Sequence, residues 1–307
     1  MIQPLRAPSP LPVRAGVAPS YIWLQKGNWK TILEFLTYRF PEVGLITWQD
    51  RMNRGEVLDE AGNILNCAST YFWGGRIFYY RELDNETPIP FDEQILFQDQ
   101  HILVVDKPHF LPVIPTGRFL HETLLVRLKN KLDLPELSPI HRLDRETAGV
   151  MIFSTNQSSR GAYQSLFQQR SVSKEYEALA ARLESYSTPF TYRSLMVPGT
   201  PFFRMQEIPG PPNSETQIEI IGEYGDVCRY RLSPRTGRKH QLRVHMAALG
   251  VPIINDAFYP VALPCKADDM SSPLKLLARS IRFTDPFSAQ ERYFESELML
   301  EASGRGS

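Results

Sequence analysis

A single carboxylate, Asp144, stands between two arginines in residues 141–150, which read His-Arg-Leu-Asp-Arg-Glu-Thr-Ala-Gly-Val. Cations on both sides favour the ionised form of a carboxylate. The apolar run of residues 150–153 follows directly and predicts a buried strand. We therefore expect Asp144 to be an anion on the loop that enters this strand. A carboxylate in such a place can act as a covalent nucleophile or stabilise a neighbouring positive charge.

Two further stretches carry groups that could assist such an anion. Residues 173–183 alternate like a strand, which places Lys174 and Tyr176 on one face. The phenol of Tyr176 could move a proton, and its ring offers a face for stacking. Residues 231–246 contain five cations and no acid, a pattern that suits phosphate groups. Within this stretch, the guanidinium of Arg243 could grip a carboxylate at two points.

These three stretches resemble the motifs of the RluA-type pseudouridine synthases, and they occur in the family's order. Residues 141–150 are similar to H-R-L-D-R-x-T-x-G-V, residues 174–178 to K-x-Y-x-A, and residues 236–245 to T-G-R-x-H-Q-[IL]-R-V-H. The similarity runs from about residue 95 to residue 294 and therefore covers most of the chain.

The resemblance implies an α+β fold with a mixed, mainly antiparallel sheet and flanking helices. It also implies an enzyme that breaks the bond from ribose to uracil N1 in RNA, turns the base, and rejoins it through C5. This isomerisation needs no cofactor, because no electrons or groups enter or leave. Two positions depart from the family's pattern: Asn255 stands where glycine is usual, and Ala278 follows Leu277 where the family has a histidine.

The family's functional residues carry over to matching positions. Asp144 matches the nucleophile, Tyr176 the active-site tyrosine, and Arg243 its ion-pair arginine, while Arg142 matches the arginine that fills the gap left by a flipped base. The residues expected to contact RNA are Arg142, Arg145, Lys174, Arg238, Lys239, His240 and Gln241. We expect His141 to orient its loop and His245 to be structural or to face RNA.

Composition limits the remaining classes. The chain has 307 residues, a formal net charge of zero, and three widely spaced cysteines without a C-x-x-C pair. This predicts a reducing, cytoplasmic setting without structural zinc or another metal. No apolar run approaches the roughly 18 residues of a membrane span. We expect ribosomal or transfer RNA as the partner, no membrane, and a monomer.

We expect two domains behind a leader. Residues 1–29, which are rich in proline, are assigned to an extended leader. Residues 30–85 are assigned to a small α+β accessory module and residues 90–300 to the catalytic domain. The module weakly resembles a small RNA-binding module of ribosomal proteins. However, residues 1–95 hold nine Lys/Arg against eleven Asp/Glu, so an accessory module without RNA binding stays open.

Periodicity and turn residues predict the main elements of the catalytic domain. A hairpin is expected over residues 95–105, a helix over 122–131, and a helix that Asn156 caps. The proline-rich residues 196–213 are expected to be a loop, between strands over 173–183 and 216–221. The third motif, residues 236–245, is expected to begin a helix that lasts to Gly250.

Three alternatives were weighed against a synthase. A protein kinase lacks support, because the chain has no Gly-rich loop, V-A-I-K lysine or D-F-G. A glycosidase normally needs two spaced carboxylates, and only Glu146 offers a second one near Asp144. The remaining alternative is a non-catalytic RNA-binding protein on a synthase scaffold.

Overall fold

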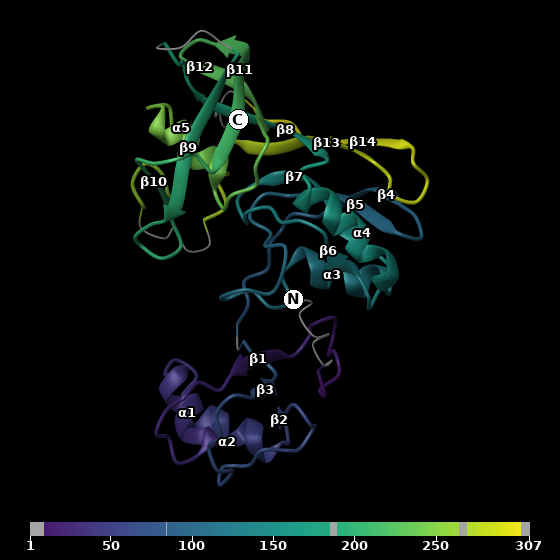
Figure 1. The fold of residues 1–307 in the computed structure, drawn as a ribbon, viewed down its shortest axis with the longest axis vertical. Coiled ribbons are helices and arrows are strands. Elements are labelled where there is room, and N and C mark those ends of the chain that lie inside the picture. The colour runs from purple at the N-terminus through teal and green to yellow at the C-terminus, as the bar shows by residue number, and fades with distance from the viewer. Residues whose placement is uncertain (1–8, 84, 185–188, 264–268, 302–307) are drawn as a thin grey trace. The chain divides into compact units, whose positions relative to one another are not determined.

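The computed structural model describes residues 9–83, 85–184, 189–263 and 269–301 (Figure 1). The chain divides into two compact units. The first comprises Met1–Glu86 and Thr116–His121, and the second comprises Thr87–Pro115 and Glu122–Ser307. The division after Glu86 falls between the expected module of residues 30–85 and the expected catalytic domain of residues 90–300. The assignment of Thr116–His121 to the first unit had no signal in the sequence.

The first unit is a small three-stranded antiparallel sheet with two helices. Its elements are β1 (Ser20–Trp23), α1 (Ile32–Arg39), α2 (Leu45–Asn53), β2 (Val57–Asp59) and β3 (Arg76–Tyr79), with strand order β1-β3-β2. Ile32 and Trp48 from the two helices are fully buried in its core, and Ile22 of β1 packs against the same core. The proposed leader of residues 1–29 therefore contains a strand of this unit, because Ile22 faces the core.

The second unit is built on one large sheet. Its strands are β4 (Gln94–Gln98), β5 (Ile102–Lys107), β6 (Ser138–Pro139), β7 (Ala148–Ser154), β8 (Val172–Ala181), β9 (Phe190–Pro198), β10 (Met205–Ile208), β11 (Ser214–Tyr224), β12 (Val227–Pro234), β13 (Leu276–Thr284) and β14 (Glu291–Glu295). The path through the sheet is β10-β9-β11-β12-β8-β13-β7-β5-β4, with β14 beside β13 and β6 beside β7. Among the named strands only β7 and β13 pair in parallel. The expected mixed, mainly antiparallel sheet is confirmed.

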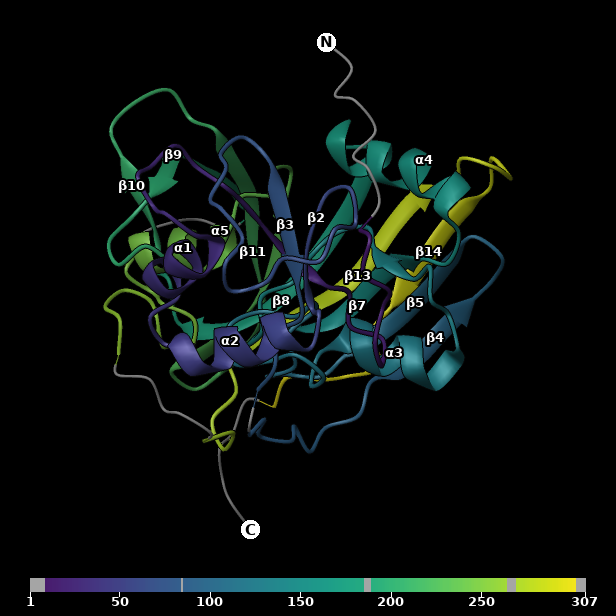
Figure 2. The same cartoon turned by 90° about the horizontal axis from the view of Figure 1, so that it is seen from below.

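Three helices flank this sheet: α3 (Leu124–Leu132), α4 (Gln157–Gln168) and α5 (Gln241–Ala248). The side chain of Asn156 accepts a hydrogen bond from the backbone of Ser158, so the expected cap of α4 is confirmed. Helix α4 packs against β7, and α5 packs against β9, β10 and β11 (Figures 1 and 2). The two helices therefore cover strands from opposite parts of the sheet path.

Two expectations about local structure were wrong. Residues 196–213 are not all loop, because β9 continues to Pro198 and β10 pairs with it in antiparallel register. The prolines stand at the end of β9 and in the turns on either side of β10, where no ladder hydrogen bond is needed from them. The second wrong expectation is the start of the helix in the third motif. Helix α5 starts at Gln241, so residues 236–240 of this motif form a loop.

Gly149 allows the strand behind the Asp144 loop to approach β13 closely. Its φ of +109° lies in the region that favours glycine, and a Cβ atom there would meet the carbonyl oxygen of Ala278 at 2.2 Å. Ala278 is the register partner of Gly149 on β7 and also of Tyr176 on β8. One residue of β13 therefore lies beside both neighbouring strands, and this brings the Asp144 loop near Tyr176.

Candidate active site

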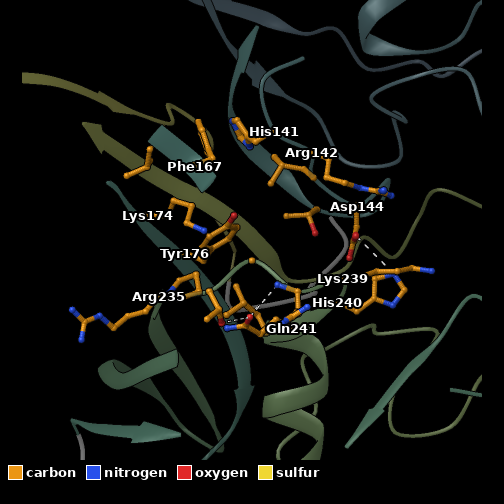
Figure 3. A pocket seen from close by; sticks show the side chains of 18 of the residues that line it. His141, Arg142, Asp144, Phe167, Lys174, Tyr176, Arg235, Lys239, His240 and Gln241 are labelled. Atoms are coloured by element: carbon orange, nitrogen blue, oxygen red, sulfur yellow. Dashed lines mark hydrogen bonds and ion pairs between the residues drawn. The ribbon is translucent and has the colours of Figure 1, made fainter. Parts of the chain in front are cut away.

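Three separate elements bring Asp144, Tyr176 and Arg243 to the walls of one cavity of about 620 Å³ (Figure 3). Asp144 lies in the turn before β7, where its carbonyl oxygen accepts a hydrogen bond from the backbone of Thr147 at 3.2 Å. Tyr176 belongs to β8 and Arg243 to α5. The loop, the strand and the helix that carry these three residues therefore meet at one cleft.

The guanidinium of Arg243 is shared between two carboxylates. Its Nη1 donates to Asp144 Oδ2 at 3.2 Å, while its Nε and Nη2 donate to Asp256 Oδ2 and Oδ1 at 2.8 and 2.7 Å. Burial acts to lower the Arg243 pKa, but the hydrogen bonds and charges of Asp256 and Asp144 raise it overall. Arg243 is therefore a permanent cation that joins the nucleophile candidate to a buried acid.

Asp256 was missed as a site residue. It follows the stretch Val-Pro-Ile-Ile-Asn, similar to a family pattern, and that was its only signal in the sequence. Its Oδ1 also accepts hydrogen bonds from the backbone of Phe258 and Tyr259 at 2.8 and 3.1 Å. Its side chain is 1% exposed, whereas that of Asp144 is 20% exposed. Asp256 is therefore the fixed anchor of Arg243, and Asp144 is the carboxylate open to the cavity.

His240 faces the other oxygen of Asp144. Its Nε2 lies 3.8 Å from Asp144 Oδ1, and its Nδ1 lies 2.8 Å from the hydroxyl of Tyr259. Burial lowers the pKa of His240 to about 4, against the opposing effect of the Asp144 charge. The imidazole is therefore uncharged near neutral pH, and Arg243 is the cation that balances Asp144.

Tyr176 and Lys174 lie across the cavity from Asp144 and Arg142 (Figure 3). Burial raises the pKa of Tyr176, and the negative charge of Asp144 raises it further, so the phenol keeps its proton. Burial lowers the pKa of Lys174. The cavity wall formed by β8 thus presents a protonated hydroxyl and an amine.

Lys107, which lies outside the predicted site, braces the Asp144 loop from behind. Its side chain is fully buried and donates to three backbone carbonyl oxygens, those of Pro108, Leu111 and Arg145, at 2.9, 2.8 and 3.0 Å. Burial lowers its pKa to about 7, while the charges of Glu146 and Asp144 act to raise it. This amine ties the end of β5 to the residue that follows Asp144.

Two residues expected to contact RNA already pair with other groups of the protein. The Gln241 amide accepts from the Thr236 hydroxyl and the Arg238 backbone, and it donates to the Glu215 carbonyl and the Thr216 hydroxyl. Because Gln241 is buried and every polar group of its amide has a partner, its expected RNA contact is not supported, and it braces the loop before α5 instead. The Arg145 guanidinium is paired with Glu146, and Arg145 does not line the cavity.

The remaining basic residues surround the cavity opening. The cations that line it beside Arg243 are Arg142, Arg170, Lys174, Arg235, Arg238 and Lys239. Within the described ranges, only Arg235 of these has a carboxylate oxygen within 4 Å, that of Glu215 at 3.6 Å. Arg170 and Arg235 were not among the predicted contacts. A rim of cations without acidic partners is suited to phosphate groups.

The two other histidines of the motifs are structural. His141 accepts a hydrogen bond from the backbone of Ile152 at 3.0 Å and stacks on Phe167, and burial lowers its pKa to about 3. It therefore orients its loop, as expected. His245 is fully buried and its Nε2 lies 2.9 Å from the Ser214 hydroxyl. This burial excludes His245 from contact with RNA.

Three general properties bear on the expected setting. Within the described ranges, helices are too short and too polar to cross a bilayer. No group of three His, Cys, Asp or Glu residues in the same ranges could hold a metal ion. Cys67 and Cys228 are free thiols, and Cys265 lies outside the described residues.

Comparison with known proteins points to one family. A family model described as RNA pseudouridylate synthase matches residues 101–248. The dual-specificity RNA pseudouridine synthase RluA of Escherichia coli K12 is 34% identical over 205 residues, which is 66% of this chain and 91% of that protein. An uncharacterised RNA pseudouridine synthase of Synechocystis is 25% identical over 231 residues, covering 74% of this chain and 79% of that protein.

Solved structures agree. The human RNA pseudouridylate synthase domain containing 1 has a TM-score of 0.56 and 26% identity, covering 69% of this chain and 87% of that chain. The human domain containing 4 protein has a TM-score of 0.54 and 25% identity, covering 67% of this chain and 88% of that chain.

Proposed function

Because the chain belongs to the RluA-type family of RNA pseudouridine synthases, we propose that it isomerises specific uridines of structured RNA with Asp144 as the nucleophile. One observation carries the assignment of Asp144. It is the carboxylate of the cavity that is open to solvent on one side and held by the Arg243 guanidinium on the other. This geometry keeps an anion at the cavity wall, beside the space that a sugar carbon would occupy.

The proposed reaction needs no external group. A carboxylate oxygen of Asp144 forms a bond to the ribose C1′ as the bond from C1′ to uracil N1 breaks, and the bonding electron pair leaves with the uracil. The base turns within the cavity, C5 bonds to C1′, and the carboxylate departs with its electron pair. One proton leaves C5 and one is taken up at N1, so the product is an isomer of the substrate.

Tyr176 is proposed to handle the base. Because its phenol stays protonated, it can donate a hydrogen bond to a uracil carbonyl oxygen and offer its ring face for stacking. Its position on the cavity wall opposite Asp144 supports a second role, in which the hydroxyl accepts the proton that leaves C5 while it gives up its own. A nucleotide must leave its stack to reach this cavity, at a cost of a few kcal/mol.

The cations around the opening are proposed to hold the RNA backbone. Arg142, Lys174, Arg238 and Lys239 all line the cavity, and the structure adds Arg170. Arg142 is further proposed to fill the gap left by the flipped nucleotide. Each phosphate contact that is lost should lower the slope of log affinity against log salt by about 0.7 for a single strand. Lys239→Gln should therefore weaken binding and flatten this slope.

The test is formation of pseudouridine by the purified protein, detected by chemical labelling of RNA. Asp144→Ala should abolish labelling while RNA affinity is retained. Glu146→Gln is the matched control, because Glu146 is the neighbouring carboxylate and pairs with Arg145. Labelling that survives Asp144→Ala would refute the nucleophile. RNA binding without labelling by the unaltered protein would favour the non-catalytic alternative, which the assembled Asp144, Tyr176 and Arg243 argue against.

The finer assignments are part of the same proposal. We propose that the substrate is ribosomal or transfer RNA, that the protein acts as a monomer in the cytoplasm, and that the first unit, which includes β1 and therefore begins before residue 30, is an accessory module to the catalytic second unit. Support comes from the free cysteines and from the E. coli relative, which is named a dual-specificity enzyme. Pseudouridine maps of both RNA classes from cells with and without the gene would test the substrate.

A further inference from the structure

Asp144 and four other residues form a closed ring of contacts. Starting at Asp144 Oδ2, the ring passes to Arg243 and on to Asp256 through two hydrogen bonds. Asp256 then accepts from the backbone of Tyr259 at 3.1 Å, and the Tyr259 hydroxyl meets His240 Nδ1 at 2.8 Å. His240 Nε2 closes the ring at Asp144 Oδ1, 3.8 Å away. Each carboxylate oxygen of Asp144 thus faces a different residue.

The Tyr259 hydroxyl decides which nitrogen of His240 carries the proton. This hydroxyl already accepts a hydrogen bond from the backbone N–H of Met205 at 2.8 Å. Tyr259 is buried, and a buried hydroxyl normally also donates its own proton. Among the described residues, the acceptor within reach is His240 Nδ1. Nδ1 is therefore the acceptor, and the single ring proton of the uncharged imidazole lies on Nε2.

The backbone at His240 fixes where this N–H points. His240 has a φ of +56° and precedes the first residue of α5, so the ring is placed by the loop and not by the helix. Its side chain is 6% exposed, and both nitrogens point into the ring of contacts. A direct role in holding RNA, as expected from the motif, would leave this geometry unexplained.

We propose that His240 is a positioning residue for Asp144: the Tyr259 hydroxyl sets its tautomer, and its Nε2–H orients Asp144 Oδ1 while Arg243 holds Oδ2. The proposal rests on Asp144 being the nucleophile. At 3.8 Å the contact is longer than a full hydrogen bond, so Oδ1 keeps a lone pair free to attack. Because the donor is uncharged, it orients the carboxylate without neutralising it.

The first test compares two substitutions of different reach. The amide nitrogen of glutamine can occupy the position of Nε2, whereas that of asparagine reaches only the position of Nδ1. His240→Asn should lower the single-turnover rate at saturating RNA about tenfold, and RNA affinity should stay within about twofold of the unaltered protein. His240→Gln should recover the rate to within about threefold. Exposed His121 gives the matched control, His121→Asn.

The second test reads the tautomer without using activity. Nitrogen NMR of the histidine-labelled, full-length protein should show His240 with its proton on Nε2, and Tyr259→Phe should shift the balance toward Nδ1. Tyr293→Phe is the control, because that tyrosine is exposed, its hydroxyl donates to Glu295, and it does not line the cavity. The Tyr259→Phe variant should also lose rate with little change in RNA affinity.

The outcomes separate this inference from the proposed function. If the unaltered protein forms no pseudouridine, the function fails, and the NMR result alone decides whether Tyr259 sets the His240 tautomer. If the protein is active but His240→Asn and His240→Gln lose RNA affinity equally at an unchanged rate, His240 is an RNA contact and the inference is overturned. A proton found on Nδ1 in the unaltered protein would overturn it as well.

Discussion

Replacing Asp256 with asparagine would test whether Arg243 needs two carboxylates. Asp256 Oδ1 accepts three hydrogen bonds, from Arg243 Nη2 and from the backbone of Phe258 and Tyr259, while Oδ2 accepts one from Arg243 Nε. An asparagine that keeps the oxygen in place of Oδ1 must turn its NH₂ group toward Arg243 Nε. Two donors then face each other, and a buried cation loses its nearest anion.

The expected cost follows from this geometry. Removing one partner of a buried ion pair costs about 3–5 kcal/mol. We expect roughly 3 kcal/mol for Asp256→Asn, since the three Oδ1 contacts survive and Arg243 still pairs with Asp144. For a domain of this size that lowers the melting temperature by about 6–12 °C. The freed guanidinium should engage Asp144 more fully and slow the single-turnover rate about tenfold or more.

Urea unfolding and single-turnover pseudouridine formation measure the two effects separately. Asp285→Asn is the matched control, because Asp285 is equally buried and accepts from the Tyr163 hydroxyl and two backbone N–H groups away from the cavity. The control should lose stability but keep the rate of the folded enzyme. An Asp256→Asn protein with unaltered unfolding and an unaltered rate would refute the shared-guanidinium reasoning.

Three further changes test the supporting structure. Gly149→Ala should destabilise the fold by roughly 2–4 kcal/mol in urea unfolding, because a Cβ atom would meet the Ala278 carbonyl at 2.2 Å; unaltered stability would show that β7 can shift freely. Lys107→Met should leave three carbonyl oxygens without their donor and cost about 2 kcal/mol, with a slower rate at unchanged RNA affinity; Lys26→Met, at an exposed position, should do neither. Burial lowers the pKa of His240 and of His245 to about 4, so the unfolded chain binds more protons than the folded chain below about pH 6.5. The free energy of unfolding should therefore fall as pH drops from 6.5 to 4. A urea midpoint that stays constant over this pH range would contradict the prediction.

Local patterns were sufficient where the physical signal is local. Asn156 was predicted as a helix cap because an amide side chain before an amphipathic stretch satisfies a free backbone N–H, and the structure shows that bond. The strand after Asp144 was readable from its apolar run. The prediction of a loop over residues 196–213 from their prolines was wrong, because the prolines lie around residues 205–208 and not within them. These four residues form β10, which pairs with the end of β9.

Long-range contacts within the site were not readable. Asp256 lies 13 positions from Arg243 along the chain, and the family-like stretch before it does not indicate which cation its carboxylate meets. Tyr259 also has no signal in the sequence, because its role depends on a contact between its hydroxyl and His240 that forms only on folding. Gln241 is the converse case. It belongs to a basic motif and lines the cavity, yet the polar groups of its amide already have partners within the protein.

The charges of the site are separated in space in a way that suits the proposed chemistry. At the centre, two carboxylates share one guanidinium, and the neighbouring His240 and Tyr176 are uncharged, so a net negative charge remains. The cations that line the cavity beside Arg243 are mostly exposed, and within the described ranges only Arg235 among them has an acidic partner. Phosphates would therefore be held at the opening, while the sugar, which gains positive charge as its bond to uracil breaks, would meet the anionic centre. A further cation placed beside Asp144 would weaken this separation, which is a physical reason for the imidazole there to be uncharged.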